Sequence, residues 1–439
     1  MSLPGIRFSQ RRHQAAEQSI AFLMQQGIEN RDVISLAAGF VDETTLPVSL
    51  VRQSIAEILT DDAEGHRVLQ YGTTAGFGLL RENLLSHLAR LENCSTSELS
   101  VTADEIVVTS GSQQLLQHLA DVLFDPGDIC LVAAPTYFVF LGTLNGVGAR
   151  TIAIDTDEQG MRMDALEAEL ARLEQAGDLH RVKMIYLVSS FENPSGVTLV
   201  DDRRQQVVGI AQRWSKEQRI LILEDAAYRE LRYEGEDGPS IWSYDQSRDF
   251  VILAQTFSKS FSPGIRVAYG VLPSDLVAAV HDVKGNFDFG SPNLNQRIVA
   301  HALRSGQYEQ HVSALQSSYR VKRDAMLAAA DEFFSELPGV SWLRPNGGLY
   351  VWMTLPDEIE TGFDSPLFQR ASKSEGVMYV PGEISYPDGS PLQRRTQMRL
   401  SFGVESPAAI RDGMLRLSRA VSYIMGCLRR SVDLPGAHV

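Results

Sequence analysis

RILILEDAAY, residues 219–228, and FVILAQTFSKSFSPGIR, residues 250–266, are the two stretches that decide the fold. Each opens with a short, nearly continuous run of Ile, Leu, Val and Ala and then turns polar. Runs of this length and composition are typical of strands that are covered on both faces, as in a parallel sheet. The two stretches therefore predict neighbouring buried strands, each followed at once by residues able to do chemistry.

Five more apolar runs surround these two, and helical sequence separates several of them. Helices are expected at 112–124, 163–176 and 201–217. The alternation of strands and helices indicates an α/β fold whose seven-stranded, mostly parallel sheet has helices on both faces. The five additional strands are EIVVTS (105–110), DICLVAAP (128–135), ARTIAID (149–155), VKMIYLVSS (182–190) and VAYGVLP (267–273).

The pattern of expected helices and strands changes on either side of this sheet. Ahead of it, helices are expected at 13–27, 48–60 and 76–91. Behind it, a long helical run covers 295–335, and three short apolar runs follow. Those runs are LYVWMTL (349–355), GVMYVPG (376–382) and QMRLSFG (397–403). This order predicts a smaller α+β domain at the end of the chain.

Composition narrows the class of protein. The chain has 439 residues, which suggests two domains, and a net charge of -15, which does not favour nucleic acid as a partner. Cys94, Cys130 and Cys427 are far apart, and there is no CxxC or HExxH motif, so no metal site is expected. No run of about 18 apolar residues occurs, so no membrane partner is expected either. These features fit a cytoplasmic protein.

Ligands of parallel sheets bind at the carboxyl ends of the strands, so the residues that follow each run are the candidates for a binding site. Lys259 follows one strand directly and is one of only six lysines. A lysine buried there becomes a nucleophile for a carbonyl, whereas a lysine reaching from a strand end into solvent would be inert. This segment alone leaves both interpretations open. A Ser/Thr–Lys hydrolase is not favoured, because neither SDN nor KTG occurs in the chain.

Two other strand ends carry polar groups. Asp225 ends a buried strand, where it either caps a helix or keeps a pyridine nitrogen protonated. The turn Gly111, Ser112, Gln113 opens a helix, where it either binds an anion or is an ordinary turn. GxGxxG opening a first βαβ unit and GxxxxGK[ST] are both absent.

The order of eight short motifs resembles one known family. The motifs are LQYG (69–72), SGSQQ (110–114), APTY (134–137), FENPSG (191–196), EDAAY (224–228), TFSKSFSPGIR (256–266), NGGLYVW (346–352) and RLSFG (399–403). Taken together they resemble the fold-type-I aminotransferases, the class I/II group of pyridoxal-phosphate enzymes. The resemblance runs from about residue 34 to about residue 425 and is closest to the aminoadipate, kynurenine and aromatic aminotransferase branch.

The resemblance implies a role for each matching residue in binding pyridoxal 5'-phosphate. Lys259 corresponds to the Schiff-base lysine and Asp225 to the partner of the pyridinium nitrogen. Tyr228 and Asn193 correspond to the pair that binds the phenolic oxygen, and Tyr137 to the aromatic residue that stacks on the ring. The residues that match the phosphate site are Gly111, Ser112, Gln113, Thr256, Ser258 and Arg266.

Substrate and subunit contacts are implied in the same way. Arg399 corresponds to the arginine that binds the substrate α-carboxylate, a role that suits its forked guanidinium. Gly39 and Asn193 correspond to residues beside the substrate. Tyr71 corresponds to a tyrosine that reaches the phosphate of a neighbouring subunit, which implies a homodimer.

The expected function is transfer of an amino group from an L-amino acid to a 2-oxo acid in amino acid metabolism, with Lys259, Asp225 and Tyr228 as the catalytic residues. A lyase, decarboxylase or cyclase on the same scaffold stays open. A non-catalytic amino-acid-binding protein would not need Lys259, Asp225 and Arg399 together. The expected parts are an N-terminal arm (1–46) packing with the small domain, a large cofactor-binding domain (47–310) and a small domain (311–439).

Four positions depart from the pattern of many relatives, namely Ala133, Ser189, Glu192 and Gln255. Glu192 is expected to bring a negative charge near the phenolic oxygen of the cofactor. None of the four positions carries the core chemistry, so the departures bear on tuning or substrate choice. The sequence does not identify the amino acid or the 2-oxo acid.

Overall fold

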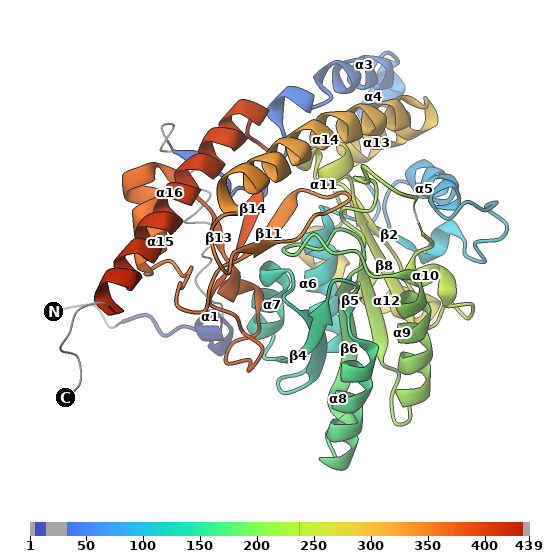
Figure 1. Cartoon of the computed structure of the whole chain (residues 1–439). Helices are drawn as coiled ribbons and strands as arrows, with labels where there is room; N and C mark the ends of the chain where they lie inside the picture. The colour runs from blue at the N-terminus through green and yellow to red at the C-terminus, as the bar shows by residue number, and fades with distance from the viewer. Residues whose placement is uncertain (1–4, 15–32, 237, 433–439) are drawn as a thin grey trace.

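The computed structural model describes residues 5–14, 33–236 and 238–432 of the chain (Figure 1). These residues form a large sheet, a smaller sheet and a short two-stranded pairing. The helix expected at 13–27 lies almost entirely outside the described residues, which include only α1 (Gln10–Gln14) from that part. None of the helices described is both long and apolar enough to cross a membrane.

The large sheet contains the seven strands that the apolar runs predicted. Its spatial order is β2-β9-β8-β7-β6-β3-β4-β5, with β9 antiparallel to both of its neighbours and β5 antiparallel to β4. The eighth strand, β5, is a two-residue edge strand that is too short to give a periodic signal in the sequence. The strands are β2 (Ile106–Thr109), β3 (Ile129–Ala134), β4 (Arg150–Asp157), β5 (Gly160–Met161), β6 (Val182–Val188), β7 (Leu221–Asp225), β8 (Val251–Thr256) and β9 (Ala268–Val271).

Helices cover both faces of this sheet, because successive side chains of a strand point to opposite faces. In β3, Cys130 and Val132 join one core cluster, whereas Ile129 and Leu131 join the other. The first cluster includes side chains of α6 (Ser112–Leu123), α7 (Phe138–Gly146) and α12 (Ser274–Asp288). The second includes side chains of α5 (Gly78–Leu91), α8 (Met163–Gln175), α9 (Asp201–Trp214) and α13 (Asn293–Arg304).

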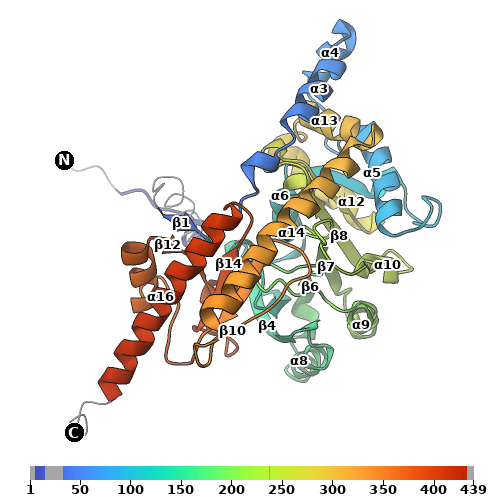
Figure 2. The same cartoon turned by 45° about the horizontal axis from the view of Figure 1, so that its top comes forward.

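The smaller sheet is entirely antiparallel and has the order β10-β11-β14-β13. Its strands are β10 (Ser341–Trp342), β11 (Tyr350–Thr354), β13 (Val380–Pro381) and β14 (Gln397–Ser401). The long helices α14 (Gln307–Phe334) and α16 (Pro407–Val432) lie side by side next to it, as both views show (Figures 1 and 2). The small antiparallel sheet follows the large sheet in the chain, as expected.

Residues from before the large sheet also reach this second part. β1 (Ile34–Ser35) pairs in parallel with β12 (Val377–Met378). The Ser401 N–H donates to Leu36 O at 2.7 Å, and Lys322 and Asp42 form an ion pair of 2.7 Å. Residues 34–42 are thus bound to the part of the molecule that contains the small sheet, although they precede the large sheet in the sequence.

The long helical run expected at 295–335 is two helices. α13 ends at Arg304 and α14 begins at Gln307, with Gly306 in the left-handed region at φ 71°. Glycine adopts this conformation without steric cost, so it turns the chain between the two helices. The other helices within the described residues are α3 (Val48–Ile58), α4 (Asp62–Val68), α10 (Ile241–Tyr244), α11 (Phe257–Ser260), α15 (Pro366–Arg370) and a π-helical turn at Ala371–Glu375. In the same residues, 3₁₀ turns occupy Glu43–Thr45, Ala103–Glu105, Leu179–Arg181, Pro263–Ile265 and Gly382–Ser385.

Candidate active site

Asp225 is brought to the site by the two-residue period of β7. Leu221 and Leu223 face the core cluster shared with α6 and α7, so Asp225, two residues on, points the same way. Tyr186 of β6 donates a hydrogen bond to Asp225 Oδ2 at 3.0 Å, and the Ala227 N–H donates to Oδ1 at 3.2 Å. Burial raises the pKa of Asp225 to about 6. Among the described residues Asp225 forms no ion pair, so a cationic ligand atom would supply its missing partner.

Lys259 lies on α11, the short helical turn that follows β8. Its amine donates a hydrogen bond to Gly39 O at 2.8 Å, which joins the loop after β1 to the end of the large sheet. Burial lowers the pKa of Lys259, and the positive charges of Arg399 and Arg266 lower it further. A lysine with a lowered pKa has a larger neutral fraction, and the neutral amine is the form that attacks carbonyls and accepts protons.

Arg399 reaches the same place from β14 of the smaller sheet. The side chain is 1 % exposed, and its Nη1 donates to Asn193 Oδ1 and its Nη2 to Ala37 O, both at 2.8 Å. Its Nε is buried and has no hydrogen-bond partner in the described part of the chain, where Arg399 also makes no ion pair. A buried guanidinium with this unmet capacity suits a carboxylate, which it can bind through two parallel hydrogen bonds.

A glycine turn with free N–H groups lies where β2 leads into α6. Gly111 has φ 83°, and a Cβ at this position would overlap the guanidinium of Arg266. Arg266 Nη2 donates to Ser110 O at 3.2 Å, which holds the arginine over the start of α6. The first N–H groups of α6, from Ser112 and Gln113, have no partner within the helix and carry the positive end of its dipole. These donors give the turn the features of an anion site.

The other members of the predicted phosphate site are arranged differently. Thr256 and Ser258 are buried, and their hydroxyl groups lie 3.0 Å apart at the start of α11. The side-chain amide of Gln113 donates to Thr143 Oγ1 of α7 at 2.9 Å. Gln113 therefore offers the site its backbone N–H, whereas its side chain nitrogen is already bound.

Aromatic side chains close the site. Tyr228 is 5 % exposed, and its hydroxyl lies 3.1 Å from the hydroxyl of Tyr350 on β11. Tyr137 is half-buried at the start of α7, where burial raises its pKa. Asn193 is 4 % exposed and accepts from Arg399, as described above. The sequence motifs around these residues thus meet at one edge of the sheet.

Tyr71 differs from the other predicted site residues in its exposure to solvent. Its side chain is 84 % exposed, and its ring centroid lies 6.4 Å from that of Phe289.

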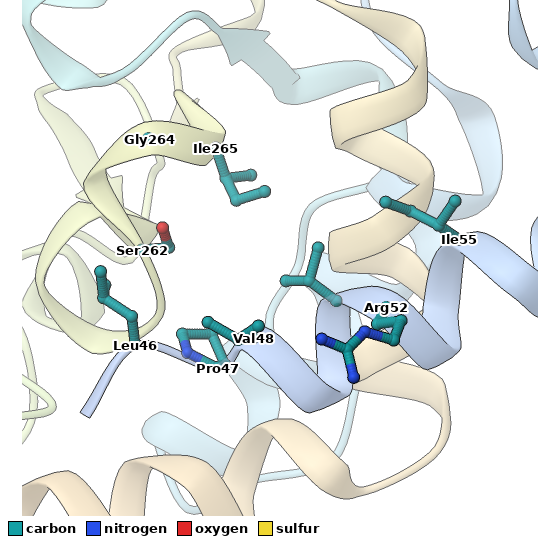
Figure 3. Close-up of a pocket in the computed structure, with 9 residues that line it drawn as sticks. Leu46, Pro47, Val48, Arg52, Ile55, Ser262, Gly264 and Ile265 are labelled. Carbon is teal, nitrogen blue, oxygen red and sulfur yellow. The ribbon is translucent and has the colours of Figure 1, made fainter. Parts of the chain in front are cut away.

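An open, mostly apolar pocket of about 440 Å³ lies beside α11, between α3 and the loop that follows Ser262. Figure 3 shows Leu46 and Pro47 on one side of this pocket and Ser262 and Ile265 on the other.

Two residues important to this site were missed by sequence reasoning. Tyr186 is a polar residue inside an apolar strand, which was a usable signal for its bond to Asp225. Tyr350 lies in the quoted motif NGGLYVW, but its contact with Tyr228 spans 122 residues and depends on how the two sheets meet.

The expected charge at Glu192 is corrected by the structure. The side chain is 5 % exposed, and burial raises its pKa to about 8, so the carboxyl is mostly protonated at pH 7. It accepts a hydrogen bond from Ser195 at 2.9 Å. Ser189 donates to Glu224 at 2.7 Å, and Gln255 accepts from Tyr269. Ser189, Glu192 and Gln255 thus bond to other side chains of the protein.

The combined geometry fits a flat cofactor that carries a phosphate. The start of α6 offers a phosphate turn, and Asp225 offers a carboxylate with no cation beside it. Tyr228 and Asn193 offer polar groups for a ring oxygen, and Lys259 offers an amine for an aldehyde. Pyridoxal phosphate has all four of the matching groups.

Known proteins that resemble this chain support the same cofactor class. Residues 31–408 match the model of the family "Aminotransferase class I and II". The chain is similar to the aromatic-amino-acid aminotransferase 1 of Thermococcus litoralis, with 34% identity over 91% of this chain and 90% of that one. It is also similar to the 2-aminoadipate transaminase of Thermus thermophilus, with 30% identity over 90% and 93% of the two chains.

A solved structure extends the likeness to the fold. The crystal structure of Pyrococcus horikoshii kynurenine aminotransferase is similar, with a TM-score of 0.86 and 34% identity over 95% of this chain and 97% of that one. The family match covers most of the chain, and the relatives are covered over nearly their whole length. The chain therefore belongs to the class I and II aminotransferases, the fold-type-I enzymes that use pyridoxal phosphate.

Proposed function

We propose that this aminotransferase takes its amino group from an aromatic L-amino acid, kynurenine or 2-aminoadipate and passes it to a 2-oxo acid. One observation supports the assignment of the site, namely that Asp225 at the end of β7, Lys259 just after β8 and the buried Arg399 all lack an ion pair among the described residues. The donor class is supported by the printed names of three relatives of at least 30% identity.

Substrate binding is assigned to Arg399 and Asn193. The guanidinium binds the α-carboxylate, and the existing bond of 2.8 Å to Asn193 fixes the plane of the fork. Gly39 lies beside this fork, where a Cβ would come within 3.2 Å of the Tyr350 hydroxyl. Glycine at this position therefore keeps the Tyr350 hydroxyl and the Arg399 fork uncrowded.

Proton transfer is assigned to Lys259. Bound pyridoxal phosphate supplies an electron-accepting ring that stabilises negative charge on the substrate Cα. With the cofactor bound, the neutral amine of Lys259 would act as the general base that takes the proton from the substrate Cα, and its protonated form would then act as the general acid. In the loaded enzyme Asp225 would hold the ring nitrogen protonated, Tyr228 would donate to the phenolic oxygen, and Tyr137 would lie against the ring and exclude water.

We also propose that the enzyme is a cytoplasmic homodimer of amino acid biosynthesis in which Tyr71 reaches the phosphate of the partner site. The support is that Tyr71 is largely exposed and that the open apolar pocket of Figure 3 is lined by α3 and by Ser262, Gly264 and Ile265, which follow α11 in the chain (Figure 3). An exposed aromatic residue and an apolar hollow are typical of a subunit interface. For the parts of the chain we propose the arm 1–46, the large domain 47–310 and the small domain 311–439.

Spectroscopy tests the reaction. The purified protein is loaded with pyridoxal phosphate, and single amino acids are added without a 2-oxo acid. The visible absorption band should fall with the true donor, because the enzyme keeps the amino group, and should return when a 2-oxo acid is added. A band that persists while the amino acid is consumed would favour a lyase or decarboxylase. A protein that shows no cofactor band would overturn the proposal.

Subunit complementation tests the crossing of Tyr71. Tyr71→Phe protein and Lys259→Ala protein are each weakly active or inactive, and they are mixed under conditions that exchange subunits. If Tyr71 serves the partner site, each mixed dimer contains one fully intact site, and activity rises on mixing. No rise despite proven exchange would contradict the crossing.

A further inference from the structure

The hydroxyl groups of Tyr228 and Tyr350 form a buried pair. Their oxygens lie 3.1 Å apart, and their rings meet edge to face with centroids 5.7 Å apart. Tyr350 is 1 % exposed and lies on β11 of the small sheet, whereas Tyr228 follows β7 of the large sheet. The hydrogen bond therefore joins the two sheets at the site itself.

The surroundings decide which hydroxyl donates. The Arg399 guanidinium lies 4.3 Å from the centroid of the Tyr350 ring. Although burial alone would raise the pKa of Tyr350, the charges of Arg399 and Lys259 and the bond with Tyr228 bring that pKa below its ordinary value. Burial raises the pKa of Tyr228 well above the ordinary value. Tyr350 is the more acidic phenol and hence the stronger donor of the pair.

We propose that Tyr350 is a positioning residue for Tyr228: it donates its proton to the Tyr228 oxygen, so that the Tyr228 proton is directed at the phenolic oxygen of the bound cofactor. This inference rests on the proposed role of Tyr228. A phenol that already accepts one hydrogen bond is fixed in rotation and is a better donor to its other partner. Tyr350 thus sets the strength of a contact that it does not itself make.

The cofactor's own titration reports this contact. A donor to the phenolic oxygen stabilises that oxygen in its anionic form and lowers the pH at which the cofactor loses its proton. Loss of the Tyr350 hydroxyl weakens the donation by Tyr228, so the midpoint of the pH-dependent change in the cofactor's visible absorption should move up. The shift should be about 0.3–1 pH unit, the size of one neutral hydrogen bond.

The experiment is a double-mutant cycle on the cofactor-loaded enzyme. The absorption midpoint is measured for wild type, Tyr350→Phe, Tyr228→Phe and the double variant. Tyr350→Phe should raise the midpoint, Tyr228→Phe should raise it by more, and Tyr350→Phe should add nothing in the Tyr228→Phe background. The KM for the amino acid should stay within about twofold in Tyr350→Phe, since the ring below Arg399 is kept, a change of under about 0.5 kcal/mol.

Two results would overturn the inference, and they differ from failure of the proposed function. One is an unmoved midpoint in Tyr350→Phe protein that binds cofactor and melts like wild type. The other is an equal shift in both backgrounds, which would mean that Tyr350 acts without Tyr228. Failure of the proposed function would appear earlier, as a wild-type protein without a visible band. Tyr350→Leu, which also removes the ring, serves as a contrast: it should raise the KM as well as the midpoint, and an unchanged midpoint there would count against the inference.

Discussion

The side chains of Glu92 and Arg229 are about as buried as those of Asp225 and Arg399, but Glu92 and Arg229 form an ion pair, whereas Asp225 and Arg399 have none among the described residues. Glu92 of the loop after α5 and Arg229 of the turn after β7 are 3 % and 4 % exposed and form an ion pair of 2.5 Å. Arg229 also donates to Leu91 O, and the Ser240 N–H donates to Glu92. At the site, by contrast, the described residues give Asp225 and Arg399 hydrogen bonds but no opposite charge.

The difference suggests that the Glu92–Arg229 pair stabilises the fold, whereas the unpaired charges of Asp225 and Arg399 are available to a ligand. Removing one member of a buried pair strands the other, which costs stability, whereas removing an unpaired buried charge relieves a desolvation penalty. Variants of the two regions should therefore have opposite effects on activity and on stability.

Lys259→Ala should give the largest effect. The amine proposed to move the proton is lost, so turnover should fall by about 10⁴-fold, the upper end of the range for a positioned general base. The melting temperature should hold or rise, because a half-buried amine has been removed. Single-turnover kinetics and thermal melting measure the two quantities. An active variant would remove Lys259 from the catalytic role.

Arg229→Met should mainly affect folding. Glu92 would be left buried without its arginine, at a cost of about 3–5 kcal/mol in the free energy of unfolding. The folded fraction should keep its kcat/KM, since Arg229 points away from the site toward α5. Denaturant melts give the free energy, and the double variant Glu92→Leu with Arg229→Met should recover part of it. A loss of kcat/KM without a loss of stability would break the comparison.

Arg399→Lys should weaken substrate binding with little change in stability. A lysine cannot make the two parallel bonds of the fork, and a lost charge-assisted contact of about 1.5–3 kcal/mol lowers kcat/KM by roughly 10- to 100-fold. The loss should fall mainly on the KM for both the amino acid and the 2-oxo acid. The matched control is the amine that lacks the carboxylate, whose slow reaction should not respond to the substitution.

Glu192→Gln should give the smallest effect, as a pH dependence of stability. Because the folded-state pKa of about 8 lies above the unfolded value of 4.5, the stabilising contribution of the protonated carboxyl is fully present below about pH 4.5 and is lost as pH rises through about 8. The wild type should lose at most about 1.4 kcal/mol between pH 6 and pH 7, and the variant should not. The free energy of unfolding of both proteins is measured at the two pH values. An equal change in wild type and variant would contradict the raised pKa.

The sequence predicted the strands of the large sheet well, because strands that helices cover on both faces consist of unbroken apolar runs. It also placed Asp225 and Lys259 correctly at strand ends. It missed β5, which is too short for a pattern, and it joined α13 to α14 because Gly306 gives no periodic signal.

Side-chain choices were the harder part. The amide of Gln113 could turn to the phosphate turn or to Thr143, and only the packing of α6 on α7 decides between them. The protonation of Glu192 depends on burial, which residue identity does not record. The Tyr228–Tyr350 contact depends on how two sheets meet, and no local spacing encodes that.

The contacts of Arg399 also bear on how the protein is made. Its two bonds reach back 206 residues to Asn193 and 362 residues to Ala37. A chain emerging from the ribosome completes the large sheet and the phosphate turn well before Arg399 is synthesised, and domains generally fold as they emerge. The strand ends expected to hold the cofactor would therefore form before the arginine expected to hold the substrate carboxylate is made.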